Sequence, residues 1–432
     1  MTKPLSGQPA GPVPAAPESS TSWRFGRLLS APHRLGFMAG ALMLALSALW
    51  WAAVLALRQF APGLAWAVPP SLGHGLLMAL GFTPFFIVGF LFTAGPRWLG
   101  QPEVAARNLL VPVLALLAGW MLVLPGLTLA AGLAAAGMAL VALGWAALCL
   151  HFSRLLLTSR ATDRLHASLV ALAAWVGVLA MALAAAALLR GDTTLLRAAT
   201  QLALWGFVAP VFAAVSHRMI PFFSASALPF LDAWRPTWLL WTLMAVLWLE
   251  AAFALAELWW WPLPAALRWA QVAFEAPAAA LLLWLALRWG LVQSLRIRLL
   301  AMLHGGFVWL GLALALAALS HALMAATGGA MSLGLAPLHA MTMGYLGATL
   351  FAMATRVSAG HSGRPLAADN PAWALYWVLQ TAVLLRVVAA VWPAASTVLT
   401  WAALLAWAMA VVGWALRYGS WFGRPRADGR PG

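Results

Sequence analysis

Histidine, methionine and arginine are the residues of this sequence best suited to chemistry, and they recur at the ends of long apolar segments. The stretch 335–366 holds the densest set, with His339 and Met343 near its start and His361 and Arg364 near its end. Imidazole nitrogen and thioether sulfur together suit Cu(I), and imidazole also ligates haem iron. This stretch therefore points to a metal or haem site.

The pair His339 and Met343 has a counterpart earlier in the chain, His74 and Met78. Both pairs are spaced i,i+4 at the start of an apolar segment, so on an α-helix each would lie on one face. Two such pairs on one side of a membrane predict a copper site. The alternative is that the methionines, 16 in this chain, only pack between helices.

A second group of polar residues is predicted at the opposite ends of the apolar segments. His217 and His304 could hold a non-covalent haem between two facing helices, and glycines 305 and 306 would let a bulky ligand approach. Arginines 218, 356 and 364 could receive the haem propionates. The alternative is that the histidines are interfacial polar caps and the arginines only set the topology.

The composition places the chain among polytopic membrane proteins. Hydrophobic residues make up 64% of it, charged residues 8%, and the mean hydropathy is +0.90. The net charge of +15 comes from arginines at the ends of apolar segments, so it indicates topology and a lipid bilayer as partner, and no nucleic acid. The single cysteine, Cys149, excludes a C-x-x-C-H haem attachment, so any haem is of the non-covalent b type.

Segments of about 20 apolar residues suffice to cross a bilayer. By that rule the sequence predicts an all-α bundle of about twelve membrane-spanning helices. We expect a disordered cytoplasmic tail over 1–34, the transmembrane domain over 35–417, and a basic cytoplasmic tail over 418–432. The expected spans are 35–57, 73–95, 108–129, 131–152, 166–189, 198–219, 237–257, 265–287, 299–321, 335–355, 372–392 and 395–416.

The basic residues support an even number of spans. Twenty of the 25 Lys and Arg residues fall on the side of the N-terminus, four fall on the other side, and Arg386 lies within a span. Because cytoplasmic loops carry most Lys and Arg, both termini are predicted to be cytoplasmic.

Three ionisable residues are predicted inside spans, where charges are costly. Glu250, Glu275 and Arg386 predict a structural Glu–Arg pair, with proton relay or substrate contact as alternatives.

The stretch HAMTMGYLGATLFAMATRVSAGHSGRPL, residues 339–366, resembles the NnrS family of polytopic membrane proteins. Members carry an H-A-x-T-x-G helix start followed by R-V-S-x-G-H-T-G-R-P-L, and here Ser362 replaces the threonine. Three shorter matches follow the family's order, at residues 89–98, 218–223 and 303–310. The resemblance therefore runs from about residue 70 to 420.

One departure concerns the second span. Family members commonly begin it with H-x-H-E-M, whereas here Leu76 and Leu77 replace the second histidine and the glutamate. His74 and Met78 remain in register. His217 also stands where many members have a small residue. The ligand set of this chain therefore differs from the family pattern on the outer side.

The resemblance implies a twelve-span bacterial inner-membrane protein that contains haem and copper and is linked to nitric oxide metabolism, nitrosative-stress tolerance and denitrification. Nitric oxide is then an expected ligand, and haem or copper redox activity toward it an expected reaction class. By this interpretation His304 and His361 are candidate ligands for either haem or copper. A respiratory-chain partner or a second copy of the chain cannot be identified from the sequence.

Two other functions are compatible with the residues. A secondary transporter or copper-handling permease without haem would use Glu275, Arg386 and the His–Met pairs. A cytochrome b-like respiratory electron carrier would need two bis-histidine haems, one toward each side of the membrane.

Overall fold

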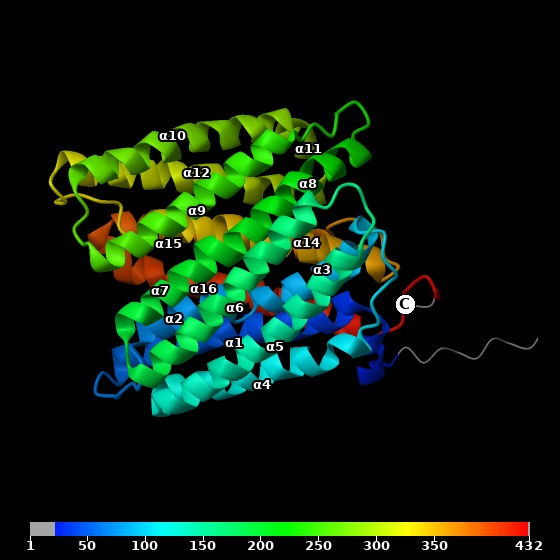
Figure 1. Cartoon of the computed structure of the whole chain (residues 1–432), viewed down its shortest axis with the longest axis horizontal. Coiled ribbons are helices and arrows are strands. Elements are labelled where there is room, and N and C mark those ends of the chain that lie inside the picture. Colours follow the sequence, from blue (N-terminus) through cyan, green and yellow to red (C-terminus); the bar gives the residue numbers. More distant parts are fainter. Residues whose placement is uncertain (1–21, 431–432) are drawn as a thin grey trace, which may run out of the picture.

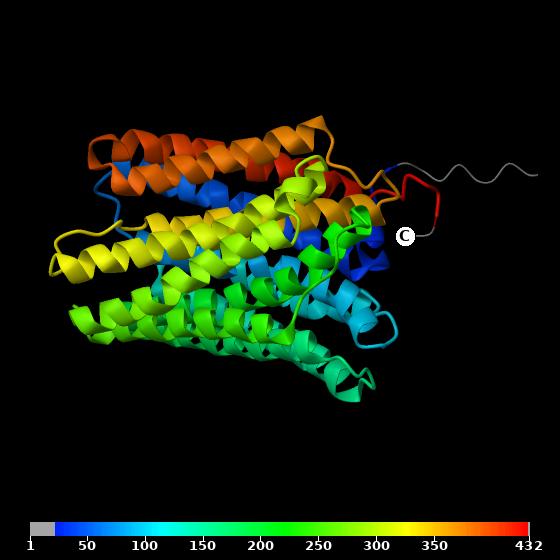
Figure 2. The same ribbon diagram turned by 90° about the horizontal axis from the view of Figure 1, so that it is seen from above.

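Long helices running along a common axis make up the protein, which a computed structural model describes for residues 22–430 (Figures 1 and 2). No strand occurs in these residues. The first half comprises α1 (Pro32–Phe60), α2 (Pro70–Leu80), α3 (Thr83–Trp98), α4 (Arg107–Leu129), α5 (Ala131–Thr158), α6 (Leu165–Arg190), α7 (Thr193–Gln201) and α8 (Ala209–Ala227). The second half comprises α9 (Thr237–Trp259), α10 (Ala265–Arg288), α11 (Leu291–Ser294), α12 (Arg298–Ala326), α13 (Ala336–His339), α14 (Ala348–His361), α15 (Asn370–Val391) and α16 (Ser396–Phe422).

Eleven helical segments within residues 22–430 are long and apolar enough to cross a membrane. The predicted tenth span is also helical, but it is divided into α13, the π-helix η3 (Ala340–Gly347) and α14, so no single α-helix covers it. Helices satisfy their own backbone groups, which a bilayer interior requires. The prediction of an all-α, multi-pass membrane bundle is therefore confirmed.

Both described ends of the chain lie at the same end of the bundle. The backbone N–H of Arg24 donates to the carbonyl of Gly423 at 2.8 Å, and Figure 1 shows α1 starting close to where the chain ends. We call this end the terminal end and the opposite one the far end. Because successive spans reverse direction, α6, α9 and α12 also begin at the terminal end.

The N-terminal helix begins earlier than the sequence indicates. Residues 1–21 of the predicted tail lie outside the described residues, but Phe25–Ser30 form a 3-10 helix, η1, and α1 already begins at Pro32. Proline suits the first position of a helix because its missing N–H would have no partner there. Arg34 is buried and donates to the carbonyls of Phe422 and Arg424 at 3.1 and 2.8 Å. The ordered part of the chain thus includes residues assigned to the tail.

The C-terminal residues are also held in place. Helix α16 runs to Phe422, beyond the predicted boundary at 417, and Ala427 N–H donates to the Ser362 carbonyl at 2.8 Å. The segment 423–430 therefore packs on the end of α14.

Two neighbouring helices approach closely at glycines. A Cβ on Gly36 of α1 would lie 2.6 Å from the backbone nitrogen of Gly89 of α3, and one on Gly89 would lie 2.5 Å from the ring of Phe37. Small residues allow such contact between membrane helices. The α2–α3 pair is in turn the most enclosed of the eleven spans, with 83% of its 18-residue apolar stretch buried. The residues at the far-end start of this pair are therefore held in place by its packing in the centre of the bundle.

Two π-helical turns interrupt the central helices. One is η2 (Leu202–Val208), between α7 and α8, and the other is η3, which begins directly after His339. A π turn bonds i to i+5 and is frequently found at functional sites. The turn in η3 sets the direction of His339 relative to the rest of its span.

Candidate functional site

The far-end histidines, His74 of α2 and His339 of α13, lie near one another although 265 positions apart in sequence. Both His339 and Arg386 of α15 are close enough for their charges to act on His74. The ring of Trp51 of α1 stacks on the His74 imidazole, with 3.9 Å between ring centroids. Four helices thus build one site, in which the starts of two spans that were predicted on the same side lie close together.

Each far-end histidine has an unused ring nitrogen. Nδ1 of His339 lies 2.9 Å from the carbonyl of Leu335. Because a carbonyl only accepts, Nδ1 carries the hydrogen, and in the neutral ring Nε2 keeps its lone pair. Nδ1 of His74 is buried and has no hydrogen-bond partner. A histidine oriented by a backbone carbonyl through one nitrogen is the common arrangement of a metal ligand.

The two methionines are placed differently from each other. His74 and Met78 both lie in α2, so their i,i+4 relationship on one face is as expected. His339 and Met343 are separated by the start of η3, so the angle expected for an α-helix is wrong there because the π turn adds a residue. Both thioethers are partly buried and pack on the core. Their role as ligands stays a prediction.

At the terminal end, His217 of α8 is hydrogen bonded through both ring nitrogens. Its Nδ1 lies 3.0 Å from Nε2 of His166 of α6, and its Nε2 lies 3.2 Å from the carbonyl of Pro236. Neither nitrogen is free, and His217 does not pair with His304. The predicted haem pair His217–His304 is therefore not formed in this arrangement.

His304 of α12 instead pairs with Ser224 of α8. Its Nε2 lies 2.9 Å from the serine Oγ, while its Nδ1 is buried without a partner. Gly306 allows α14 to approach, since a Cβ there would lie 2.6 Å from Thr349 Oγ1. His304 keeps one nitrogen for a ligand, but the glycine beside it accommodates a helix.

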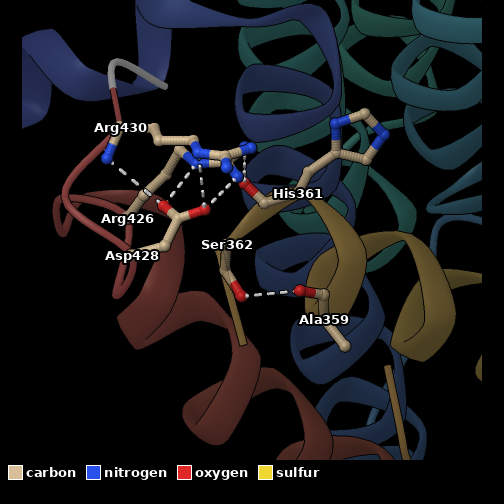
Figure 3. A network of polar contacts seen from close by, with 6 residues as sticks. All are labelled: Ala359, His361, Ser362, Arg426, Asp428 and Arg430. Atoms are coloured by element: carbon tan, nitrogen blue, oxygen red, sulfur yellow. Dashed lines mark hydrogen bonds and ion pairs between the residues drawn. The ribbon is translucent and has the colours of Figure 1, made fainter. Parts of the chain in front are cut away.

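His361, at the end of α14, packs against His33 of α1 with 4.4 Å between ring centroids. Figure 3 shows the His361 imidazole pointing away from the neighbouring ion pair of Arg426 and Asp428, while its carbonyl oxygen accepts from Arg426. Nδ1 of His33 is buried and has no partner. These two rings form a third pair of imidazoles from different helices, after His74–His339 and His166–His217.

The charged groups around His361 come from several parts of the chain, namely Arg97, Glu103, Arg34 of α1 and Arg426 of the C-terminal segment. Arg426 forms an ion pair with Asp428 at 2.6 Å, and this hydrogen-bonded partner holds the pKa of the Asp428 carboxyl well below its usual range. Burial lowers the pKa of Arg364, whose guanidinium lies over the Trp421 ring at 4.2 Å. The terminal end is thus rich in cationic groups.

The other predicted propionate partners also lie at the terminal end. Arg356 stands over the ring of Phe223 at 3.9 Å, and Arg218 stands over Trp98 at 5.0 Å while pairing with Asp163 at 3.4 Å. Aromatic faces hold cations in this way. Arg356 has no carboxylate partner among the ion pairs of the described residues, which leaves it available to an anionic group.

Sequence reasoning missed several of these contacts. His33 was assigned to the tail and His166 to the first residue of the span 166–189, and both are the second residue of a helix, α1 and α6. The expected Glu–Arg pair involving Arg386 is wrong, because Arg386 lies beside the far-end histidines and the pair in α9 and α10 is Glu257 with Arg268. A histidine beginning a span is the signal that could have found His33 and His166.

Across residues 22–430, no group of three or more His, Cys, Asp and Glu side chains is placed to hold a metal ion. The available sets are pairs of imidazoles, with thioethers and arginines around them. Two imidazoles from facing helices suit a haem iron, whereas a copper ion would need a thioether or another donor as well.

The fold and the site define a multi-pass helical membrane protein with imidazole pairs at both ends of its bundle. A family model described as NnrS protein matches residues 27–426. The chain therefore belongs to the NnrS family, which is linked to nitric oxide. No curated protein matches the chain.

Proposed function

We propose that this protein binds haem b and copper in a bacterial inner membrane, and that it binds or turns over nitric oxide in nitrosative-stress tolerance. Besides membership of the family, one observation carries the proposal. Histidines from different helices meet in pairs in which imidazole nitrogens are buried and have no partner, as for His74 and His33. A buried polar atom without a partner costs free energy unless a ligand completes it.

The far-end histidines are the side chains that would hold a haem iron at this end of the bundle. His339 has Nδ1 occupied by the Leu335 carbonyl, which fixes the ring and presents Nε2, and His74 is oriented by the Trp51 ring. Haem bound there would supply one-electron chemistry. The protein's own residues orient the imidazoles, and Arg386 provides a cation beside them.

Fewer side chains are placed to act as copper ligands. Met78 lies one helical turn from His74, and Met343 lies within η3, so a mixed imidazole–thioether set for Cu(I) would come from the far end. At the terminal end, His33, His304 and His361 are the candidates, whereas His217 would first have to give up a hydrogen bond.

An apolar cavity supports a role in binding a small neutral gas. It has a volume of about 60 Å³ and is lined by side chains of α1, α3, α6, α8 and α14. Val170 of its wall is one turn from His166, and Val215 is two residues from His217. Cavities of this kind exclude water and take up apolar atoms or molecules. Nitric oxide would meet no polar barrier there except the Thr349 hydroxyl.

The orientation of the protein follows from its arginines. The ends of spans at the terminal end carry Arg97, Arg218, Arg288, Arg298, Arg356, Arg364 and Arg417. We therefore assign the terminal end to the cytoplasm. Activity of a reporter enzyme that folds only outside the cytoplasm, fused in the α9–α10 connection, would check this assignment.

The test of the proposed function is a reduced-minus-oxidised spectrum with copper analysis of the purified protein, before and after addition of nitric oxide. A haem spectrum that changes with nitric oxide is expected, together with bound copper. Protein without a Soret band and without copper would overturn the proposal.

Single substitutions locate the cofactor. His74→Ala and His339→Ala should each abolish the haem spectrum, with His151→Ala as a control. His151 lies in the last third of α5 and contacts the Phe92 ring edge-on, at 6.3 Å between centroids. Full haem content in both far-end variants would exclude the far end as the haem site.

A further inference from the structure

A separate group of ionisable side chains lies between α9, α10 and α12, away from the histidines discussed above. Its centre is formed by Glu250 of α9, which is 6% exposed, and Glu275 of α10, which is 0% exposed. Isolated carboxylates are rarely buried in this way, because an unpaired charge in an apolar interior is very costly. These two side chains therefore need either a counter-charge or a proton.

The contacts of the pair show where a proton would lie. Glu250 and Glu275 contact each other, and a carboxyl oxygen of Glu275 lies 2.9 Å from Nδ1 of His321. Oε1 of Glu250 is buried and has no hydrogen-bond partner. Two ionised carboxylates in contact repel each other and have no hydrogen to share, so the contact favours the state in which one of them is protonated.

The surrounding charges do not neutralise both glutamates. Arg268 is the one cation of α9, α10 or α12 that acts on Glu275, and it is already paired with Glu257 and donates to Gln271 at 3.0 Å. His321 can offset at most one carboxylate. With Arg268 and Glu257 neutralising each other, and His321 supplying at most one positive charge, at least one proton must reside on the Glu250–Glu275 pair for the group to be neutral.

A line of polar side chains joins this pair to the far end. Arg268, Gln271 and Glu275 are spaced by three and four residues along α10, and therefore share a face. On α9, Glu250 and Glu257 are seven residues apart, again on one face. Glu257 is partly open, with 27% of its side chain exposed. The line ends at the connection between α9 and α10.

We propose that Glu250 and Glu275 bind one proton between them inside the membrane-spanning bundle, exchanging it with His321, and that Glu257, Arg268 and Gln271 connect this site to the far-end surface. The proton comes from water at that surface and returns to it, so the step is a reversible protonation with no change of redox state. The site is distinct from the candidate haem and copper ligands, and it operates in protein without either cofactor.

The first test is infrared spectroscopy of the purified, full-length protein. A protonated carboxyl has a C=O stretching band that a carboxylate lacks. We expect such a band in the wild type, shifted by exchange into D₂O and lost in both Glu250→Gln and Glu275→Gln. Glu103→Gln is the matched control, since Glu103 is on the surface with 84% of its side chain exposed. A band that survives both glutamine variants, or no band at all, would overturn the proposal.

The second test uses dicyclohexylcarbodiimide, an apolar reagent that modifies protonated carboxyl groups, followed by peptide mass spectrometry. Glu250 or Glu275 should be modified, and Glu103 should not. Labelling should fall about tenfold for each pH unit above the apparent pKa of the pair. Labelling that does not depend on pH, or absence of label from both glutamates, would contradict the assignment.

The connection to the far end is tested with a variant outside the pair. Gln271→Leu keeps the size of the side chain but removes its polar group, and should slow exchange of the carboxyl band into D₂O at least about tenfold while leaving the band itself in place. Wild-type exchange kinetics in this variant would exclude the route through Gln271. Helical circular dichroism and elution volume confirm that each variant is folded, so that loss of the band is not loss of structure.

Discussion

Nε2 of His166 and Nδ1 of His217 lie 3.0 Å apart, and this bond determines the protonation of both rings. Nε2 of His217 faces the Pro236 carbonyl at 3.2 Å, so it carries the hydrogen and donates. Nδ1 of His217 must then accept, and His166 donates through Nε2. The imidazole lone pair that no hydrogen bond uses in this His166–His217 pair is therefore that of Nδ1 of His166, which is buried without a partner.

This arrangement predicts that His217 has a structural role. His217→Ala should lower the free energy of unfolding by about 1–3 kcal/mol, because it leaves the buried His166 ring without its acceptor. It should not change the content of haem or copper. Denaturation in detergent and the metal and haem content per protein would measure the two effects. Loss of haem from His217→Ala together with full haem in His74→Ala would instead assign the haem to the terminal end.

Substitution of two glycines should have opposite effects on stability, because one lies in the contact between α1 and α3 and the other faces no neighbouring atom. Gly36→Ala places a Cβ 2.6 Å from the Gly89 backbone, so overpacking should destabilise the protein by about 1–3 kcal/mol. Gly132→Ala in α5 meets no atom within 4 Å and should be neutral or stabilising by up to about 1 kcal/mol, since alanine favours a helix. Thermal unfolding of both variants makes the comparison. Equal stability of the two would show that α1 and α3 can move apart without cost.

Gly363 is predicted to control docking of the C-terminal segment. Its φ of +69° is unfavourable for other residues, and a Cβ would lie 2.5 Å from a carboxyl oxygen of Asp428. Gly363→Ala should therefore release residues 423–430 and expose the Ala427 amide to hydrogen exchange. Gly360→Ala is the control, because its nearest atom would be Leu366 Cδ1 at 3.5 Å. Unchanged protection of Ala427 in Gly363→Ala would contradict this role.

The membrane bundle could be predicted from hydropathy because each span has to be apolar for about 20 residues, whatever it packs against. The pairings of polar side chains could not, since they depend on how each helix is rotated. The π turn of η3 changes that rotation after His339 without any break in hydrophobicity. His33 shows the same limit, because its helix begins in a stretch of low apolar content and is fixed by contacts with residues nearly 400 positions away.

The far-end site shows what the sequence does specify. His74 and His339 were predicted to lie on the same side of the membrane because each begins a span there. Assigning a residue to one side of the membrane determines only its position along the bundle axis. It does not constrain which neighbours surround the ring, so Trp51 and the true position of Arg386 emerged only with the structure.

The ion pair of Asp428 and Arg426 predicts that docking of the C-terminal segment depends on pH. Asp428 has a pKa held below its ordinary value of 3.8 by its bond to Arg426, so its contribution to docking is fully present above that value. It is lost as the pH falls through the lower pKa of the docked state. This contribution to docking should therefore be constant through the neutral range and weaken in strong acid.

Asp428→Asn separates this ion pair from other effects of acid. The amide cannot form the charge-assisted bond to Arg426, so the variant should show reduced protection of the Ala427 amide at neutral pH and a weaker dependence on acid. Protection factors corrected for the intrinsic exchange rate provide the measurement. Asp192→Asn is a suitable control, because Asp192 caps α7 by accepting from Leu195 N–H, in the connection that joins α6 to α7 at the far end. If wild type and Asp428→Asn lose protection together in the same acid range, the C-terminal segment is held by its backbone bond to Ser362 rather than by the ion pair.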